Sequence, residues 1–115
     1  MRSGNHSFGQ GLETTIAQVA CEWLKTDLAQ VKVTMGDTGL TPYSTGAYAS
    51  RGMVMAGGAV SKAAEELARR LKIHGAHLLQ CKPDEVEIND CAVPNGIASA
   101  SFAEIASAWY LHPDR

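Results

Sequence analysis

Apolar side chains recur at helical spacing near the start of the chain. They are separated by four, three, four and one residues, which places them on one face of a helix: Leu12, Ile16, Val19, Trp23 and Leu24. Glu13 and Gln18 fall off this face. The pattern predicts an amphipathic helix over about residues 10–25.

A short turn at 27–30 is followed by a segment in which apolar and polar residues alternate. Residues 31–35 read Val-Lys-Val-Thr-Met, which is typical of a half-buried strand. Residues 36–49 then carry Gly, Thr, Pro and Ser without periodicity. Long loops in compact domains are usually functional or disordered, so this loop is a candidate for function.

Helical periodicity returns between Ser50 and Gly75. The predicted buried stripe of this second helix is Met53, Gly57, Val60, Ala64, Leu67 and Leu71. Its early part is rich in small residues, although each glycine inside a helix costs about 1 kcal/mol relative to alanine. Either a ligand or a backbone approaches closely there, or the helix crosses the first one tightly. Residues 62–72 alternate in charge and are expected to be solvated.

The last third predicts a hairpin and a final helix. Residues 86–88 alternate as a short strand, Asn89-Asp90 signals a turn, and 91–93 return as its partner. A second turn follows at 94–96. Ser101 and Glu104 match a capping box, which predicts a helix over 102–111. The expected fold is α+β, with two main helices and a short C-terminal helix packed on a small sheet or hairpin.

Composition limits the class of protein without indicating its chemistry. A chain of 115 residues and 12.2 kDa predicts a single domain over 1–115, and 45% hydrophobic with 19% charged residues argues against disorder. The net charge of −2 gives no basic excess, so nucleic acid is not an expected partner. No apolar run approaches the roughly 20 residues that span a bilayer, and no secretory leader follows Met1. No membrane partner is expected.

The three cysteines, at positions 21, 81 and 91, are odd in number and lack C-x-x-C spacing. This disfavours a disulfide framework, a zinc site and an iron–sulfur site, and it favours a reducing, cytoplasmic compartment. Cys21 is expected to be a buried, inert thiol. His74 and His77 are three residues apart, but two ligands without a third do not predict a metal site. Ser50 lies outside a G-x-S-x-G pattern, so no nucleophile is predicted.

Two segments place glycines and hydroxyl residues just ahead of a predicted helix: residues 4–15 and residues 36–52. Backbone N–H groups at helix N-termini form anion sites, particularly where glycine permits close approach. The two junctions are interpreted as converging on one polyanionic ligand. The alternative is two ordinary helix entries.

The same two segments carry a family resemblance. Residues 9–15, Gly-Gln-Gly-Leu-Glu-Thr-Thr, with Ala-Gln at 17–18, resemble the "GQG-x-ET…AQ" segment of molybdenum hydroxylase large subunits. This family includes xanthine dehydrogenase, aldehyde oxidase and aerobic carbon monoxide dehydrogenase. Gly-Asp-Thr at 36–38, Thr-Pro-Tyr at 41–43 and the stretch 46–52 are similar to its "GDT…TPYGTGTYGSR" stretch. The resemblance extends from about Gly4 to Tyr110.

The resemblance implies that these loops line a molybdopterin cofactor. By position, Gln10 corresponds to the glutamine that hydrogen-bonds at the molybdenum end, and Gly9 and Gly11 let the backbone approach. The pterin and phosphate part would be held by backbone N–H and hydroxyl groups of the second loop, namely Tyr48, Ala49, Ser50, Arg51 and Gly52. Ala49 stands where the family most often has glycine, and it would be strained if φ is positive there.

Large subunits of this family are several times longer, and their catalytic glutamate lies near the C-terminus. We therefore expect an internal piece of a large subunit that carries no catalytic or metal-ligating residues and is inactive alone. Whether the chain counts as an enzyme is left open by the sequence, because its family is a family of oxidoreductases. The parent reaction is oxidative hydroxylation of aldehydes or N-heterocycles, or CO oxidation. The implied partners are the rest of the large subunit and iron–sulfur and flavin subunits. The alternative is a free-standing domain of unknown binding role that self-associates as a homo-oligomer.

Overall fold

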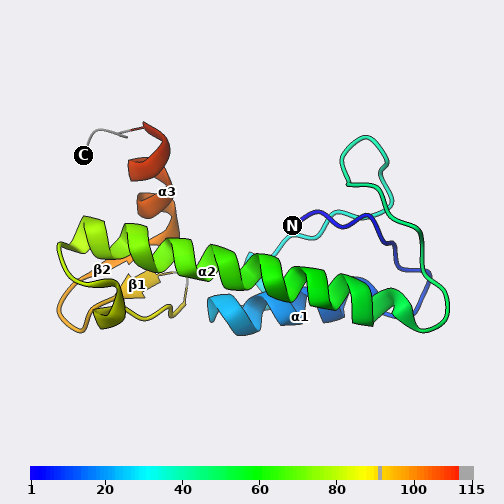
Figure 1. Cartoon of the computed structure of the whole chain (residues 1–115), viewed down its shortest axis with the longest axis horizontal. Helices are drawn as coiled ribbons and strands as arrows, with labels where there is room; N and C mark the ends of the chain where they lie inside the picture. The colour runs from blue at the N-terminus through cyan, green and yellow to red at the C-terminus, as the bar shows by residue number, and fades with distance from the viewer. Residues whose placement is uncertain (91, 112–115) are drawn as a thin grey trace. The chain divides into compact units, whose positions relative to one another are not determined.

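The computed structural model describes residues 1–90 and 92–111. Three α-helices are present in this part of the chain, α1 (Leu12–Leu24), α2 (Gly58–Leu79) and α3 (Phe102–Leu111), with the strands β1 (Ala92–Pro94) and β2 (Ser99–Ser101) (Figure 1). Three short helical segments join them: η1 (Leu28–Gln30), η2 (Gly52–Gly57) and η3 (Pro83–Glu85). The predicted α+β class is confirmed.

The chain divides into two compact units. The first comprises Met1–Trp23 and Asp27–Ala64, and the second comprises Leu24–Thr26 and the described residues from Glu65 onward. Helix α2 contributes residues to both units. The single domain stays a prediction, within which these units are distinct clusters of contacts.

In the first unit, α1 confirms the predicted amphipathic helix. Leu12 and Ile16 are buried and form a small core with Ala56, against which Val33 and Met35 pack. Trp23, by contrast, stays 39% exposed, and its indole N–H donates to the Ser61 hydroxyl at 2.9 Å. The apolar ring covers the helix while its polar edge keeps a hydrogen-bond partner.

The predicted strand at 31–35 is wrong as an extended element. Only one parallel bridge forms, between Arg2 and Thr34. The N–H of Thr34 donates to the Met1 carbonyl at 2.9 Å, and the N–H of Ser3 donates to the Thr34 carbonyl at 3.0 Å. The alternation correctly predicts that Val33 and Met35 pack inward, but pairing of this segment is limited to the bridge at Thr34.

The same N-terminal segment also holds the predicted long loop, which the structure confirms over 36–50. A Cβ added at Gly4 would lie 2.2 Å from the Pro42 carbonyl oxygen, so the two backbones are in direct contact. Asn5 is buried and its side-chain oxygen accepts a hydrogen bond from the Ser44 hydroxyl. The loop that leads into η2 is therefore fixed from the chain's first residues.

The second predicted helix starts later and runs further than expected. It opens as the π-helix η2 and continues as α2 to Leu79, four residues beyond Gly75. Met53 and Leu67, predicted to be buried, are 41% and 46% exposed. The predicted stripe is confirmed at Gly57, Ala64 and Leu71, and Val60 is partly buried. Further small residues are buried beside it: Ala56, Ala68, Gly75 and Ala76. The wider π turn shifts the register of the stripe, since it adds a residue to one turn of the helix.

In the second unit, the small residues of α2 allow the hairpin and α3 to pack closely against it. A Cβ added at Gly75 would lie 2.9 Å from Val93 Cγ1 and 3.2 Å from Ile105 Cδ1. The core also contains Val86 and Ile88, so close packing onto α2 is the common feature of this unit. At the early glycines no such tight approach is seen, because Gly58 has open space and Gly57 meets only Met53 of its own helix.

The hairpin is shifted relative to its prediction. Strand β1 pairs antiparallel with β2, with Val93 opposite Ala100, and the turn lies at 95–98. Residues 86–88 are not a regular strand, but the predicted antiparallel return is present as isolated pairing. Asn89 and Ala92 form an antiparallel bridge with hydrogen bonds of 2.9 and 3.0 Å, and the Glu87 N–H donates to the Pro94 carbonyl at 3.2 Å. The alternation of apolar residues correctly predicted which side chains of this segment are buried, but it did not predict that the segment lacks a regular strand. The predicted return strand includes Cys91, which lies outside the described residues.

The capping box of α3 is confirmed. The Glu104 carboxylate accepts from the Ser101 N–H and from the Ser101 hydroxyl, both at 2.7 Å, and the Ser101 hydroxyl accepts from the Glu104 N–H at 3.2 Å. These bonds, with the backbone bond first, lower the pKa of Glu104. Local sequence determines this helix start, so it was predictable.

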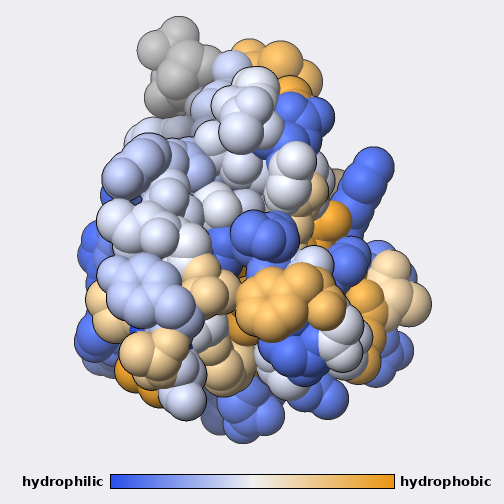
Figure 2. Space-filling model, turned by 90° about the vertical axis from the view of Figure 1, so that its right-hand side faces the viewer, coloured by the Kyte–Doolittle hydropathy of each residue, from blue (hydrophilic) through white to orange (hydrophobic). Residues whose placement is uncertain are grey.

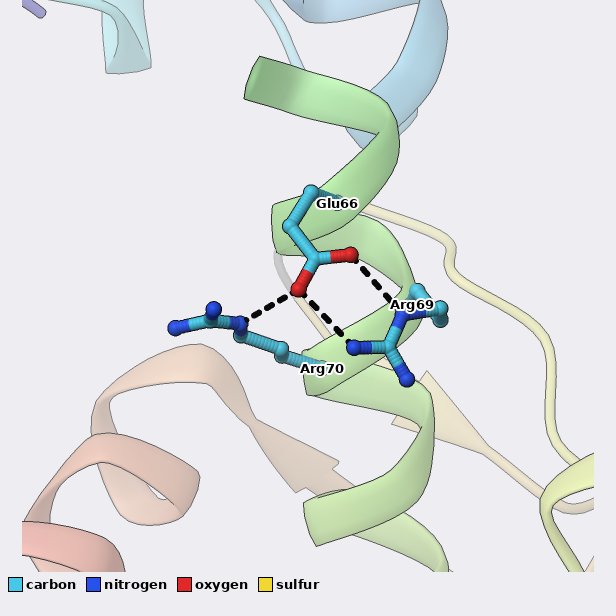
Figure 3. Close-up of polar contacts among 3 residues, drawn as sticks. All are labelled: Glu66, Arg69 and Arg70. Carbon is cyan, nitrogen blue, oxygen red and sulfur yellow. Dashed lines mark hydrogen bonds and ion pairs between the residues drawn. The ribbon is translucent and has the colours of Figure 1, made fainter. Parts of the chain in front are cut away.

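The charged stretch of α2 forms a solvated ion-pair cluster (Figure 3). Glu66 accepts from Arg69 at 2.8 Å and from Arg70 at 2.7 Å, with all three side chains 44–65% exposed. The hydrogen bond from Arg69, followed by that from Arg70, lowers the pKa of Glu66 to about 2. Within the described residues, no helix combines the length and the apolar character needed to cross a membrane.

Candidate functional site

The first candidate loop lies immediately before α1. Gly9 and Gly11 have φ of +111° and +76°, a backbone region that other residues rarely adopt. Between them, Gln10 folds back on its own loop, and its side-chain oxygen accepts from the Phe8 N–H at 2.7 Å and the Ser7 hydroxyl at 3.3 Å. The motif therefore forms a tight, exposed turn that presents the first turn of α1.

The second candidate loop forms a turn immediately before η2. Ala49 and Ser50 have φ of +50° and +60°, and the Arg51 N–H donates to the Tyr48 carbonyl at 3.1 Å. Two central residues with positive φ are the mark of a type I′ turn. The φ at Ala49 meets the condition under which strain was predicted, and a left-handed non-glycine residue costs roughly 1–2 kcal/mol.

Arg51 is held over the ring of Tyr48. The guanidinium carbon lies 4.9 Å from the ring centroid, and Nη1 donates to the Tyr48 hydroxyl at 2.7 Å. The pair therefore holds the positive charge of the guanidinium beside the turn that precedes η2. Cation–π contact and the hydrogen bond together restrict the arginine to one region.

The two loops meet where their helices begin. A Cβ added at Gly52 would lie 3.9 Å from Leu12 Cδ2, and Leu12 packs in the same core as Ala56. The first residues of α1 and η2 are therefore neighbours within the first unit. The structure brings together the two junctions that the sequence placed 40 residues apart, from Leu12 to Gly52.

The chemistry at this meeting point suits an anionic, oxygen-rich group. No atoms lie within 4 Å of a Cβ placed at Gly9, Gly11 or Gly46, so a ligand has room beside these backbones. The first N–H groups of a helix have no acceptor within the helix, and they carry the positive end of its dipole. With the Ser50 hydroxyl and the Arg51 guanidinium, these groups form a donor set suited to an anionic ligand rich in oxygen atoms.

Several large apolar side chains around these loops are exposed. Phe8 is 68%, Tyr48 is 60% and Val54 is 72% exposed, while Tyr43 reaches 91%. Figure 2 shows apolar side chains open to solvent among polar ones on the side of the molecule that carries the 36–50 loop. Exposed apolar surface of this kind is typical of an interaction or ligand site.

Ser7 and Phe8 were missed by the sequence analysis, although they hold Gln10. Phe8 acts through its backbone N–H, which every residue except proline provides, so its identity carries no signal. The only available signal was adjacency to the glycine-rich motif. The residue-by-residue roles of Gly9 to Gly11 and Tyr48 to Gly52 stay predictions.

The histidines belong to a different feature. A groove of about 1110 Å³ in the second unit is lined by residues of α2, the turn after it, β2 and α3, including His74, His77, Cys81 and Glu104. The His74 ring packs on Trp109 with centroids 4.1 Å apart. Across residues 1–90 and 92–111, no three His, Cys, Asp or Glu side chains are grouped as metal ligands. Cys21 is a half-buried thiol rather than a fully buried one, and Cys81 is likewise a thiol.

Comparison with known proteins shows the family of the chain. The family model of the molybdopterin cofactor-binding domain matches residues 1–115. Subunit gamma of the 6-hydroxypseudooxynicotine dehydrogenase complex of Paenarthrobacter nicotinovorans is 34% identical over 94% of this chain and 14% of its own length. The probable hypoxanthine oxidase XdhD of Escherichia coli K12 is 35% identical over 92% of this chain and 11% of its own.

Solved structures give the same result. Quinoline 2-oxidoreductase of Pseudomonas putida 86 superposes with a TM-score of 0.80 and 33% identity, over 99% of this chain and 15% of that one. The Cu,Mo-CO dehydrogenase gives 0.81 and 30%, over 98% and 15%. The chain therefore belongs to the molybdopterin-binding family of molybdenum hydroxylase large subunits. It spans about a seventh of the length of the first of these curated relatives.

Proposed function

We propose that this chain holds molybdopterin across its two loop–helix junctions, as one segment of a molybdenum hydroxylase large subunit. The observation that carries the proposal is the contact between the two junctions, where the backbone of Gly52 approaches Leu12. The shared core of Leu12 and Ala56 holds the two helix starts together, so both loops lie at one place. Adjacent helix N-termini, both preceded by loops with positive φ, provide a donor-rich surface for one extended anion.

Each loop has a separate part in this proposal. Gly9 and Gly11 leave space for the cofactor beside the backbone, and Gln10 hydrogen-bonds it at the molybdenum end. Backbone N–H groups from Tyr48 to Gly52, with the Ser50 hydroxyl, bind the pterin and phosphate part, and Arg51 adds positive charge. When bound, the cofactor supplies the metal centre for oxidative hydroxylation or CO oxidation.

A charge-matched pair of variants tests this site. Arg51→Ala removes the guanidinium stacked on Tyr48, whereas Arg70→Ala removes an equal charge from the exposed Glu66 cluster in the second unit. Molybdopterin binding, followed by pterin fluorescence under anaerobic conditions, should weaken about tenfold for Arg51→Ala. It should be unchanged for Arg70→Ala. Equal effects of both variants, or no saturable binding by the unaltered chain, would contradict the proposal.

We propose further that these 115 residues do not turn over substrate unaided. The sequence motifs correspond to cofactor-binding loops and include no counterpart of the family's catalytic glutamate. The parent activity then requires the rest of the large subunit with iron–sulfur and flavin subunits, in the cytoplasm. Purified chain loaded with molybdopterin should show no turnover of aldehydes, purines or CO, and turnover above the blank would overturn this point.

Self-association is a second candidate for the isolated chain. The last turn of α3 exposes Trp109, Tyr110 and Leu111 by 55–79%, an apolar group that a partner surface would cover. A symmetric dimer would bury this group against its own copy. Sedimentation at tens of micromolar should show species larger than 12.2 kDa. A single monomer peak would exclude this role.

A further inference from the structure

The Gln10 side chain has a fixed orientation in the structure. Its oxygen accepts two hydrogen bonds from its own loop, from the Phe8 N–H at 2.7 Å and from the Ser7 hydroxyl at 3.3 Å. Both donors precede Gln10 by two or three residues, and Gly9 lies between them and Gln10 with φ of +111°. This backbone conformation folds the loop so that the Phe8 N–H faces the carboxamide.

Hydrogen-bond chemistry decides which end of the carboxamide faces inward. A backbone N–H is only a donor, so its partner must be the side-chain oxygen and not the NH₂ group. Ordinarily the two ends of a glutamine amide are hard to distinguish, but a backbone donor at 2.7 Å removes the ambiguity. The Nε2 group and its two hydrogens therefore point away from the loop.

We infer that Ser7 and the Phe8 N–H are positioning groups that hold Gln10 so that Nε2 donates to an oxygen acceptor of the bound cofactor. This inference rests on the proposed function. Gln10 itself is exposed, so these two hydrogen bonds, and not burial, restrain its side chain. A glutamine that is fixed before binding avoids an entropy loss that corresponds to roughly a tenfold change in affinity.

Orientation also determines what this position selects. An outward NH₂ group favours phosphate, carbonyl or metal-bound oxygen, all of which accept hydrogen bonds. An outward oxygen would repel the same groups. Gln10→Glu separates these effects, because a carboxylate still accepts from the Phe8 N–H but donates nothing outward.

The free chain provides the first test. In ¹⁵N-labelled protein, the Phe8 amide should exchange slowly with solvent, and its exchange should accelerate in Gln10→Ala but stay slow in Gln10→Glu. A Phe8 amide that exchanges equally in all three proteins would overturn the inference, because the hydrogen bond would then be absent in solution. This readout requires no cofactor and no activity.

Cofactor affinity provides the second test, with Phe8→Pro compared with Phe8→Ala. Proline removes the N–H, whereas alanine keeps it and removes only a ring that is 68% exposed. Molybdopterin affinity should fall about tenfold for Phe8→Pro relative to Phe8→Ala. Gln10→Glu should bind at least as weakly as Phe8→Pro and does not alter the backbone. Thermal unfolding of each variant checks that the fold persists.

The outcomes separate the inference from the function on which it rests. If the unaltered chain binds molybdopterin and Phe8→Pro binds as well as Phe8→Ala, only the positioning role fails. If Gln10→Glu retains full affinity, the outward donor fails too. Inorganic phosphate as a second probe identifies the acceptor. A shift of the Gln10 NH₂ resonances with phosphate alone assigns the phosphate oxygen, and a shift only with molybdopterin assigns the pterin–molybdenum end.

Discussion

The two units of this chain use glycine for opposite purposes. In the second unit, Gly75 is buried against Val93 and Ile105, and its lack of a side chain permits close packing. In the first unit, Gly9 and Gly11 have positive φ and open space where a side chain would be. One unit maximises contact within the chain, and the other leaves backbone accessible. A glycine in the sequence can therefore serve either purpose, and its packing shows which.

The two units also differ in the size of their hydrophobic cores. Eight buried residues form the cluster of the second unit, whereas three form that of the first. The first unit instead depends on loop contacts, such as Gly4 against Pro42 and Asn5 with Ser44. Binding loops commonly have fewer buried apolar contacts than the scaffold that supports them. Four substitutions test this contrast.

The largest effect is expected from Gly75→Ala. The added methyl group would overlap Val93 and Ile105, and such overpacking typically costs about 1–3 kcal/mol. Gly58→Ala is the matched control in the same helix, because no atom lies within 4 Å of its Cβ position and its backbone is already helical. That control should raise the free energy of unfolding by up to about 1 kcal/mol. Urea unfolding measures the change in the free energy of unfolding for each variant. If both variants were stabilised, or both destabilised, the distinction between these two glycines would fail.

Ser101→Ala is expected to have the next largest effect. It removes the hydroxyl that bonds Glu104 and its N–H, and loss of an N-terminal cap costs about 1 kcal/mol. Ser107→Ala, at an exposed site on the same helix, should change stability little. Comparison of the two midpoints in urea isolates the cap. A larger loss at Ser107 would show that the capping box is not the source of stability.

Ala49→Gly should stabilise the chain slightly. Relief of the left-handed strain gains roughly 1–2 kcal/mol, and the added freedom of glycine in the unfolded chain offsets about 0.5–1 kcal/mol of it. The net gain lies between about 0 and 1.5 kcal/mol. Ala47→Gly, two residues earlier and not in the left-handed region, should destabilise instead. If both glycine variants lose stability, Ala49 is not strained in solution.

The smallest effect concerns Glu66. Its pKa is lowered from 4.5 to about 2 by Arg69 and Arg70, so its contribution is present above pH 4.5 and is lost as pH falls toward 2. Glu66→Gln should unfold at a slightly lower temperature than the unaltered chain at neutral pH, with the gap closing over that range. Because the side chains are exposed, high salt should reduce the gap. A gap independent of pH would rule out the ion-pair origin.

Local features were the most predictable from sequence. The Leu12–Leu24 helix and the capping box at Ser101 depend on neighbouring residues, so periodicity and cap chemistry were sufficient. Pairing was predictable only in part: residues 31–35 form a single bridge at Thr34, and residues 86–89 pair with β1 at isolated positions and not as a regular strand. Alternation reports which side chains face inward and not whether a sheet forms.

The candidate site was predictable only in part. Both glycine-rich junctions could be found from motif and resemblance, and so could the strain expected at Ala49. The π-helix at Gly52–Gly57, which shifts the buried stripe away from Met53, had no sequence signal. The Phe8 N–H bond to Gln10 was equally hidden, since it involves the backbone.

The central claim is that the two junctions form one molybdopterin site. An amide-resolved NMR titration of the labelled chain with molybdopterin tests it most directly. The account predicts that resonances of residues 9–11 and 48–52 shift together with one dissociation constant, while those of the hairpin at 92–101 stay fixed. Shifts confined to one loop, or centred on the groove beside His74 and Trp109, would contradict it.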